Sequence, residues 1–166
     1  MAQYLIGNGP MPTTAAFAKV TTGTAIKTML QLKTFNVARI VEWGISFDGS
    51  AAATPGQVEL IDTGTVFGTV TASADADVMK FDGAEGALAS VAGLTLGTAA
   101  TGYTCTAEGS ITATKVFDMQ LLPPTAPYVK QFPLGYQPKL IIGNCTRIRV
   151  TFGAAINCYC YMIIEI

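Results

Sequence analysis

The segment VARIVEWGISF, residues 37–47, alternates apolar with smaller or polar side chains at a period of two, which is typical of a β-strand with one buried face. The buried face would carry Arg39 together with five apolar residues: Val37, Val41, Trp43, Ile45 and Phe47. Asp48-Gly49-Ser50 then gives a strong turn signal before a second strand candidate at 57–61. We therefore expect a central strand in a loop-linked hairpin, with Trp43 as a core anchor rather than a ligand platform.

The last twelve residues show the same alternation. One side would carry Ile156, Cys158, Cys160, Met162, Ile164 and Ile166, and the other side Asn157, Tyr159, Tyr161, Ile163 and Glu165. The first side is uniformly apolar, whereas tyrosines on the second are suited to an interface that satisfies their hydroxyl groups. Because little more than Gly153-Ala154 separates this segment from a strand at 147–152, we expect a tight hairpin.

Further strand candidates make about nine in all, whereas sustained helical periodicity is scarce. They are Thr24 to Leu32, Thr65 to Ala72, Ser110 to Leu121, Tyr128 to Phe132 and Lys139 to Ile142. This pattern predicts an all-β, single-domain protein of antiparallel strands. Residues 1–22 lack strand periodicity and are expected to form an extended arm ahead of a domain at 23–166. A Gly/Ala-rich insertion near 82–109 is expected to hold a short helix at Ala84 to Val91 and an extended loop at Thr95 to Thr106.

Composition excludes many kinds of chemistry. The 166 residues contain no histidine, only 13% are charged and the net charge is −1, so the commonest general base is missing and no basic footprint for nucleic acid is present. No apolar run is long enough for a membrane span or a signal sequence, and we expect a soluble protein made in the cytoplasm.

The four cysteines, Cys105, Cys145, Cys158 and Cys160, lack metal-ligand spacing. We expect no cofactor and interpret the thiols as small buried groups, with a disulfide or a reactive thiol as the alternative.

Two sets of charged residues are candidate sites. Asp75 and Asp77 resemble a carboxylate pair for acid/base chemistry, but their surroundings favour a solvated turn. No serine triad is possible without histidine, and nothing specific supports a Ser-Lys pair, so we expect no enzymatic activity. Arg147 and Arg149 alternate with Ile148 and Val150 and should share one sheet face. They would form inter-subunit salt bridges or an ordinary exposed strand face, and the sequence leaves both open.

Four segments together resemble a family of small virion proteins of tailed bacteriophages. They are Arg39 to Ser50 (RIVEWGISFDGS), Pro55 to Leu60 (PGQVEL), Gln131 to Gly135 (QFPLG) and Arg147 to Thr151 (RIRVT). The resemblance covers roughly 37–61 and 100–166 and carries no chemical signature. It implies a β-sandwich, often of jelly-roll type, that decorates the capsid or otherwise assembles on the particle.

On this basis we expect a homotrimeric capsid decoration protein on the virion surface that bridges and stabilises subunits of the major capsid protein. Met1 to Thr22 or the Gly-rich insertion would make the contacts between subunits, and Arg147, Arg149, Tyr159 and Tyr161 are the candidate interface residues. A trimer suits the quasi-threefold positions of an icosahedral lattice and hides strand edges. The alternative is a tail, collar or head-fibre attachment module that binds a host surface glycan. A hydrolase is a third class.

Overall fold

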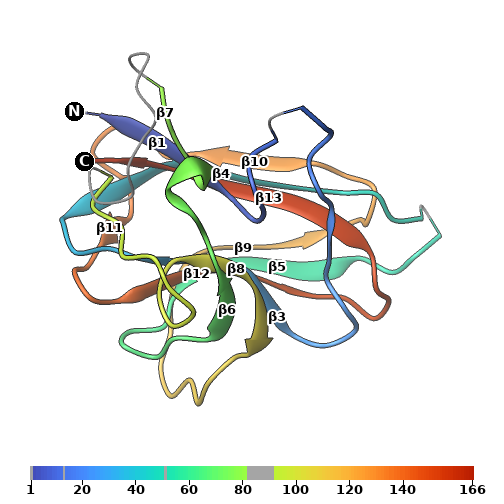
Figure 1. The fold of residues 1–166 in the computed structure, drawn as a ribbon. Helices are drawn as coiled ribbons and strands as arrows, with labels where there is room; N and C mark the ends of the chain where they lie inside the picture. The colour runs from blue at the N-terminus through green and yellow to red at the C-terminus, as the bar shows by residue number, and fades with distance from the viewer. Residues whose placement is uncertain (1, 13, 51, 82–91) are drawn as a thin grey trace.

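A computed structural model describes residues 2–12, 14–50, 52–81 and 92–166 and shows two packed antiparallel sheets (Figure 1). Sheet A has the order β10-β4-β13-β1-β7: Tyr128–Gln131, Ala38–Phe47, Asn157–Glu165, Gln3–Gly7 and Val78–Lys80. Two short strands extend it, with β11 (Lys139–Leu140) on β4 and β2 (Val20–Thr21) on β13. Sheet B has the order β6-β8-β3-β12-β5-β9: Thr69–Ala72, Gly102–Ala107, Lys27–Lys33, Cys145–Thr151, Gly56–Asp62 and Lys115–Leu122.

The expected all-β antiparallel sandwich is confirmed. Among the described residues the one helical element is the 3-10 turn η1 at Asp75–Asp77. The helix expected at Ala84 to Val91 lies outside the described residues, and jelly-roll connectivity stays a prediction. Both ends of the described chain lie side by side (Figure 1), where Ala2 and Ile166 exchange backbone hydrogen bonds of 3.1 and 3.0 Å.

The central strand β4 contains a β-bulge that shifts its alternation. Ile163 of β13 lies opposite Glu42, whereas Ile164 lies opposite Ile40, so Val41 is the extra residue. Trp43 and Ile45 face the core beyond the bulge, as predicted, but before it the buried residues are Ala38 and Ile40. Placing Val37, Arg39 and Val41 on the core face was therefore wrong, because one inserted residue moves every earlier side chain to the opposite face.

The two expected hairpins are instead arches between the sheets. The chain leaves sheet A after β4 and enters sheet B at β5, and it returns from β12 in sheet B to β13 in sheet A. Each strand of the β4–β5 arch pairs with a strand of the β12–β13 arch: β4 pairs with β13, and β5 pairs with β12. Alternation shows which side chains are buried but not which sheet a strand joins, which explains the incorrect hairpins.

The N-terminal segment and the insertion are more ordered than expected. Within residues 1–22, Gln3–Gly7 forms β1 between β13 and β7, and Val20–Thr21 forms β2. The described residues between these two strands, 8–12 and 14–19, belong to a loop that crosses the molecule (Figure 1). In the insertion, Gly102–Ala107 forms β8, in place of the extended loop expected at Thr95 to Thr106.

The core between the sheets is one cluster of apolar side chains, and Trp43 is fully buried in it, as predicted. Its indole Nε1 donates a hydrogen bond to Asp118 Oδ2 at 3.2 Å. Asp118 Oδ2 also accepts from the Tyr128 hydroxyl at 2.8 Å, and Lys130 Nζ lies 3.5 Å from Oδ1. Because each polar group in this cluster has a partner, burying the indole leaves no donor unsatisfied.

Candidate interaction surface

Tyr161 lies on the outer face of sheet A, where β13 runs between β1 and β4. It is opposite Gly44 on β4 and Gly7 on β1. A Cβ atom at position 44 would be 2.6 Å from Cε1 of the Tyr161 ring, so only glycine leaves room for the ring there. The Tyr161 hydroxyl donates a 2.7 Å hydrogen bond to Glu42 Oε1. Burial and this hydrogen bond raise the pKa of Tyr161, which keeps the phenol protonated as a donor.

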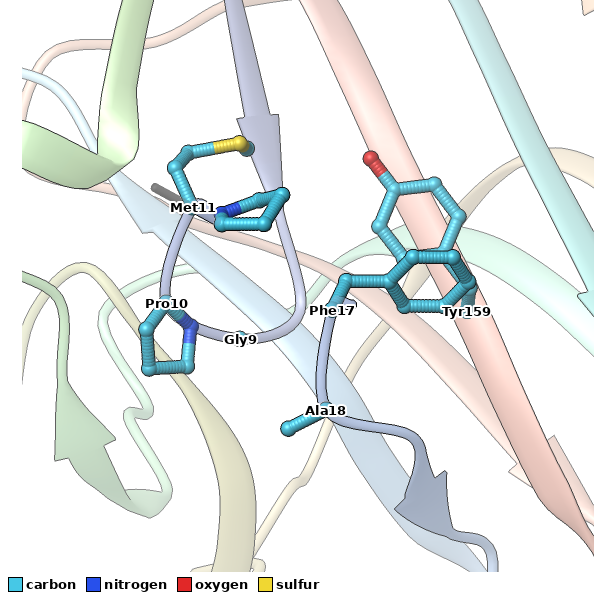
Figure 2. Close-up of a pocket in the computed structure, with 7 residues that line it drawn as sticks. Gly9, Pro10, Met11, Phe17, Ala18 and Tyr159 are labelled. Carbon is cyan, nitrogen blue, oxygen red and sulfur yellow. The ribbon is translucent and has the colours of Figure 1, made fainter. Parts of the chain in front are cut away.

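Tyr159 connects Tyr161 to the N-terminal loop. Its ring stacks on Tyr161 with centroids 6.0 Å apart and lies 5.1 Å from the ring of Phe17. Three aromatic side chains therefore form a row on the outside of sheet A, with Phe17 and Tyr159 drawn in Figure 2. The prediction that the tyrosines of this strand face away from the core is confirmed for both residues.

Beside Tyr159 the N-terminal loop encloses an apolar cavity of about 310 Å³, which we call the aromatic hollow (Figure 2). Its lining residues are Gly9, Pro10, Met11, Pro12, Phe17, Ala18 and Tyr159. These residues carry no charge. The volume and the apolar lining are those of a site that receives a side chain or a small apolar group.

A polar hollow adjoins the aromatic hollow and shares Phe17 and Tyr159 with it. Lys19 Nζ lies 2.6 Å from Asp48 Oδ2, and the Asn157 side chain donates to the same oxygen at 3.3 Å. The hydrogen bond from Lys19 lowers the pKa of Asp48. Apolar and charged surfaces therefore meet at the Phe17 ring.

Asn8 and Asp77 hold the loop in place. Asn8 Oδ1 accepts the Cys160 backbone N–H at 3.1 Å. Asp77 Oδ1 accepts the Met11 backbone N–H at 3.0 Å, and its Oδ2 accepts the Ala74 N–H at 2.8 Å. Asp77 is buried, so the solvated turn expected at Asp75 and Asp77 is wrong for Asp77, although Asp75 is exposed. A carboxylate with two backbone donors is a structural anchor.

Arg147 and Arg149 project from the outer face of sheet B, but their partners lie within the chain. Arg147 is 0% exposed beneath residues 63–68 and Glu108. Its guanidinium lies 3.0 Å from Glu108 Oε2, and it donates to the backbone oxygens of Glu108 at 3.0 Å and Val66 at 2.5 Å. This burial rules out the exposed strand face for Arg147 and leaves no open surface for the expected inter-subunit bridge.

Arg149 is also mostly covered. Its Nε donates to Glu59 Oε1, and the side chains are 14% and 7% exposed, respectively. Of the four candidate interface residues, Tyr159 therefore lines the aromatic hollow and Tyr161 stacks on it, whereas the two arginines are covered.

All four cysteines are buried and unpaired. Cys158 and Cys160 face the core from one side of β13, as the alternation predicted. Burial raises the pKa of Cys145 and Cys160, which keeps both groups as neutral thiols.

Two turns at one end of the sandwich expose four apolar side chains, Phe35, Val37, Ile141 and Ile142, and we call this surface the apolar end. The turns are adjacent because Leu140 pairs with Ala38 and the Gly143 N–H donates to the Thr34 oxygen at 2.9 Å. On the edge of sheet A, Leu134 and Tyr136 project from a further turn. Sequence reasoning missed both sites, although the run Pro133-Leu134-Gly135-Tyr136 was a readable turn signal.

In the part of the chain that the structure describes, no group of three or more acidic or cysteine side chains is placed to hold a metal ion. Within the same residues, no helix has the length and apolarity needed to cross a bilayer. Comparison of the chain with models of protein families, with curated proteins and with solved structures gave no match.

Proposed function

We propose that this protein is a structural virion protein of a tailed bacteriophage, made in the host cytoplasm, which decorates the capsid as a homotrimer and stabilises it. It would bridge neighbouring subunits of the major capsid protein. The resemblance of the four sequence segments to small virion proteins motivates the proposal. The apolar end is the structural observation that carries it.

The apolar end has the character of a protein-binding surface. Phe35, Val37, Ile141 and Ile142 lie together on two short turns that the sheets hold in place. A contiguous exposed apolar patch on a β-sandwich marks a surface that another protein covers. Since short turns on a rigid scaffold lose little conformational entropy on binding, they are suited to tight assembly.

The fold limits which part of residues 1–22 could contact a capsid subunit. β1 is an inner strand of sheet A, so deleting this segment would remove part of the fold and would not test capsid binding. The loop between β1 and β2 remains as the part of the segment available to a partner. The apolar end replaces the segment as the proposed capsid-facing surface.

The first experiment is the copy number of this protein relative to the major capsid protein in purified particles, measured by quantitative mass spectrometry. Hundreds of copies per particle would support decoration. A few dozen or fewer would contradict it and favour a tail, collar or vertex position, and absence from the particle would overturn a virion role.

Capsid binding is then tested with the variant Ile141→Ser/Ile142→Ser. We expect it to lose binding to capsids that lack the protein, because it removes half of the apolar end. Leu121→Ser is the matched control, because Leu121 is an exposed leucine on β9 that belongs to another surface. Equal binding of both variants would contradict the proposed surface.

The row Phe17, Tyr159 and Tyr161 favours a second function, an attachment module that binds a host surface glycan. Aromatic rings next to Lys19, Asp48 and Asn157 offer both stacking and hydrogen bonding to a sugar. Binding to host cell-wall glycans that Tyr159→Ala abolishes would support this alternative. Absence of such binding by the purified protein would remove it.

A further inference from the structure

Leu134 and Tyr136 are 83% and 82% exposed, more than any other large apolar side chain that the structure describes. They lie on a turn at residues 133–138, which we call the edge turn, between β10 and β11 on the edge of sheet A. The Tyr136 N–H donates to the Pro133 oxygen at 2.9 Å, and Gly135 has φ +87°, as the third position of a type II turn requires.

The edge turn is preorganised for docking. Proline stands at both of its ends, Pro133 and Pro138, and the Gln137 side chain accepts the Gly135 N–H at 3.2 Å. Since the backbone is already fixed, inserting the two side chains into a partner costs little conformational entropy. A rigid apolar projection of this kind is typical of a binding hot spot.

The aromatic hollow on the same molecule matches the side chains of the edge turn in size and in apolar character. It is a cavity of about 310 Å³, lined by Met11, Phe17, Ala18 and Tyr159 among others, and it is large enough for a leucine and a tyrosine side chain together. The edge turn and the described lining of the hollow both lack charged residues. Docking the edge turn into the hollow therefore leaves no charged group buried without a partner.

We propose that the edge turn of one copy inserts Leu134 and Tyr136 into the aromatic hollow of the next copy. The turn lies on the β10–β4 edge of sheet A, whereas the hollow lies on its outer face beside β1 and β13. The contact is therefore head to tail, and each copy has one free turn and one free hollow. Such contacts close into a ring when the rotation between copies allows it.

The size of the contact favours a ring over an isolated dimer. An aromatic side chain buries about 150–250 Å², so one turn in one hollow falls well below the roughly 800 Å² per partner of a standard interface. In a ring every copy uses both its turn and its hollow, which doubles the area buried per subunit. That the ring has three members rests on the proposed function, but the contact itself does not.

Sedimentation equilibrium of the purified protein tests the contact without capsids. We expect a trimer for the wild type, and monomers for Leu134→Ser/Tyr136→Ser and for Ala18→Glu, which places a charge in the hollow. Each change should weaken every contact by about 30-fold or more, as loss of a hot spot does. All three altered residues are exposed, so the variants should fold, and Leu121→Ser should remain trimeric.

Covalent trapping gives a second readout that also detects a weak contact. Leu134→Cys mixed with Ala18→Cys should form a 1:1 disulfide-linked dimer under mild oxidation, whereas Leu121→Cys mixed with Ala18→Cys should not. The native cysteines are buried and should not interfere. The contact is supported if position 18 cross-links to position 134 and does not cross-link to position 121.

The inference would be overturned by a wild type that is monomeric and whose position 134 does not cross-link to position 18, by a trimer that neither variant weakens, or by equal cross-linking from positions 134 and 121. Glycan binding that Ala18→Glu abolishes, with assembly unchanged, would also overturn it and assign the hollow to a sugar. Failure of the proposed function is distinguishable because it is measured on particles: a trimer absent from virions would leave the contact standing.

Discussion

The rings of Phe47 and Phe152 meet edge to face, with centroids 4.9 Å apart and planes at 63°. Phe47 ends β4 in sheet A, and Phe152 directly follows β12 in sheet B. The contact therefore joins the two arches at the point where each leaves its sheet. Edge-to-face rings add about 0.5–1.5 kcal/mol to the stability that area burial alone provides.

Replacing Phe152 should destabilise the fold more than most single changes. A Cβ atom at Gly56 would be 2.3 Å from the Phe152 ring, so the ring fills all the space beside β5. We expect Phe152→Ala to lower the free energy of unfolding by about 3–5 kcal/mol through the cavity it leaves. We expect Gly56→Ala to lower it by about 1–3 kcal/mol through overpacking. Urea denaturation, followed by the fluorescence of Trp43, measures both changes.

The two changes should also be coupled, because the added methyl group would occupy space that Phe152→Ala vacates. The double variant is expected to be more stable than the sum of the single losses predicts. If the two losses of stability are strictly additive, the Phe152 ring does not pack against Gly56 as the structure shows.

The arches show why the fold was only partly predictable from sequence. Alternation at a period of two depends on local burial, and it identified nine of the strands and the buried Trp43. Pairing of β4 with β13 depends instead on contacts between residues more than 100 positions apart, which alternation does not report. The strand β1 was missed because its apolar residues Tyr4, Leu5 and Ile6 are consecutive and do not alternate with polar ones, and glycines and prolines follow directly.

The candidate site was predictable to the same limited extent. Tyr159 and Tyr161 were placed on the outer face because their strand alternates without a bulge at that point. Phe17 and Met11 join them only through a loop that Asp77 anchors from 66 residues away in sequence. Arg147 was misplaced because the segment that covers it, residues 63–68, folds back over the sheet, and no periodic pattern predicts such a cover.

Breaking the ion pair between the buried Arg147 and the partly exposed Glu108 should destabilise the fold. Arg147→Met leaves the Glu108 carboxylate, the Val66 oxygen and the Thr28 hydroxyl without this donor. We expect a loss of about 1–3 kcal/mol in the free energy of unfolding, the range for lost hydrogen bonds to a charged or buried group, because water can reach the Glu108 carboxylate, which is 22% exposed. Arg147→Lys should also destabilise, because an ammonium group cannot reproduce the planar fork.

The ion pair between Lys19 and Asp48 is the internal control for this prediction. Its side chains are 57% and 36% exposed, so solvent screens the attraction. Lys19→Met should leave the urea midpoint close to that of the wild type. An equal effect of Lys19→Met and Arg147→Met would show that burial does not set the energetics of these pairs.

Asp77 should keep the loop that lines the aromatic hollow in a fixed conformation. Both oxygens of Asp77 accept backbone N–H groups, and Asp77→Asn leaves a single acceptor oxygen for these two donors. A buried donor without a partner costs about 1–3 kcal/mol. We expect faster hydrogen exchange in residues 8–12 of this variant, measured by mass spectrometry. Amides of β12 serve as the control, and if they accelerate equally, the effect is global and Asp77 has no specific role in the loop.

Stability should fall at alkaline pH because the fold favours the protonated form of several phenols and thiols, among them the three groups Tyr128, Cys105 and Tyr161. Burial and the hydrogen bond to Asp118 raise the pKa of Tyr128 to about 12, and burial and the charge of Glu108 raise the pKa of Cys105 to about 11. The pKa of Tyr161 is also raised. In the unfolded chain a thiol loses its proton near pH 8.5 and a phenol near pH 10. The folded chain therefore holds more protons between about pH 9 and 12, and the free energy of unfolding must decrease as pH rises through this interval.

Urea midpoints between pH 8 and 11 measure this decrease. Below about pH 8 these groups are protonated in both states, so they give no slope there. Tyr128→Phe removes one of the three groups and should flatten the decrease, although it lowers stability at every pH by removing the hydrogen bond to Asp118. Phenolate absorbance should show the Tyr128 titration near pH 12, well above that of an exposed phenol, if unfolding does not come first. A midpoint that is constant or rises over this interval would show that the buried phenols and the thiol do not keep their protons in the folded state.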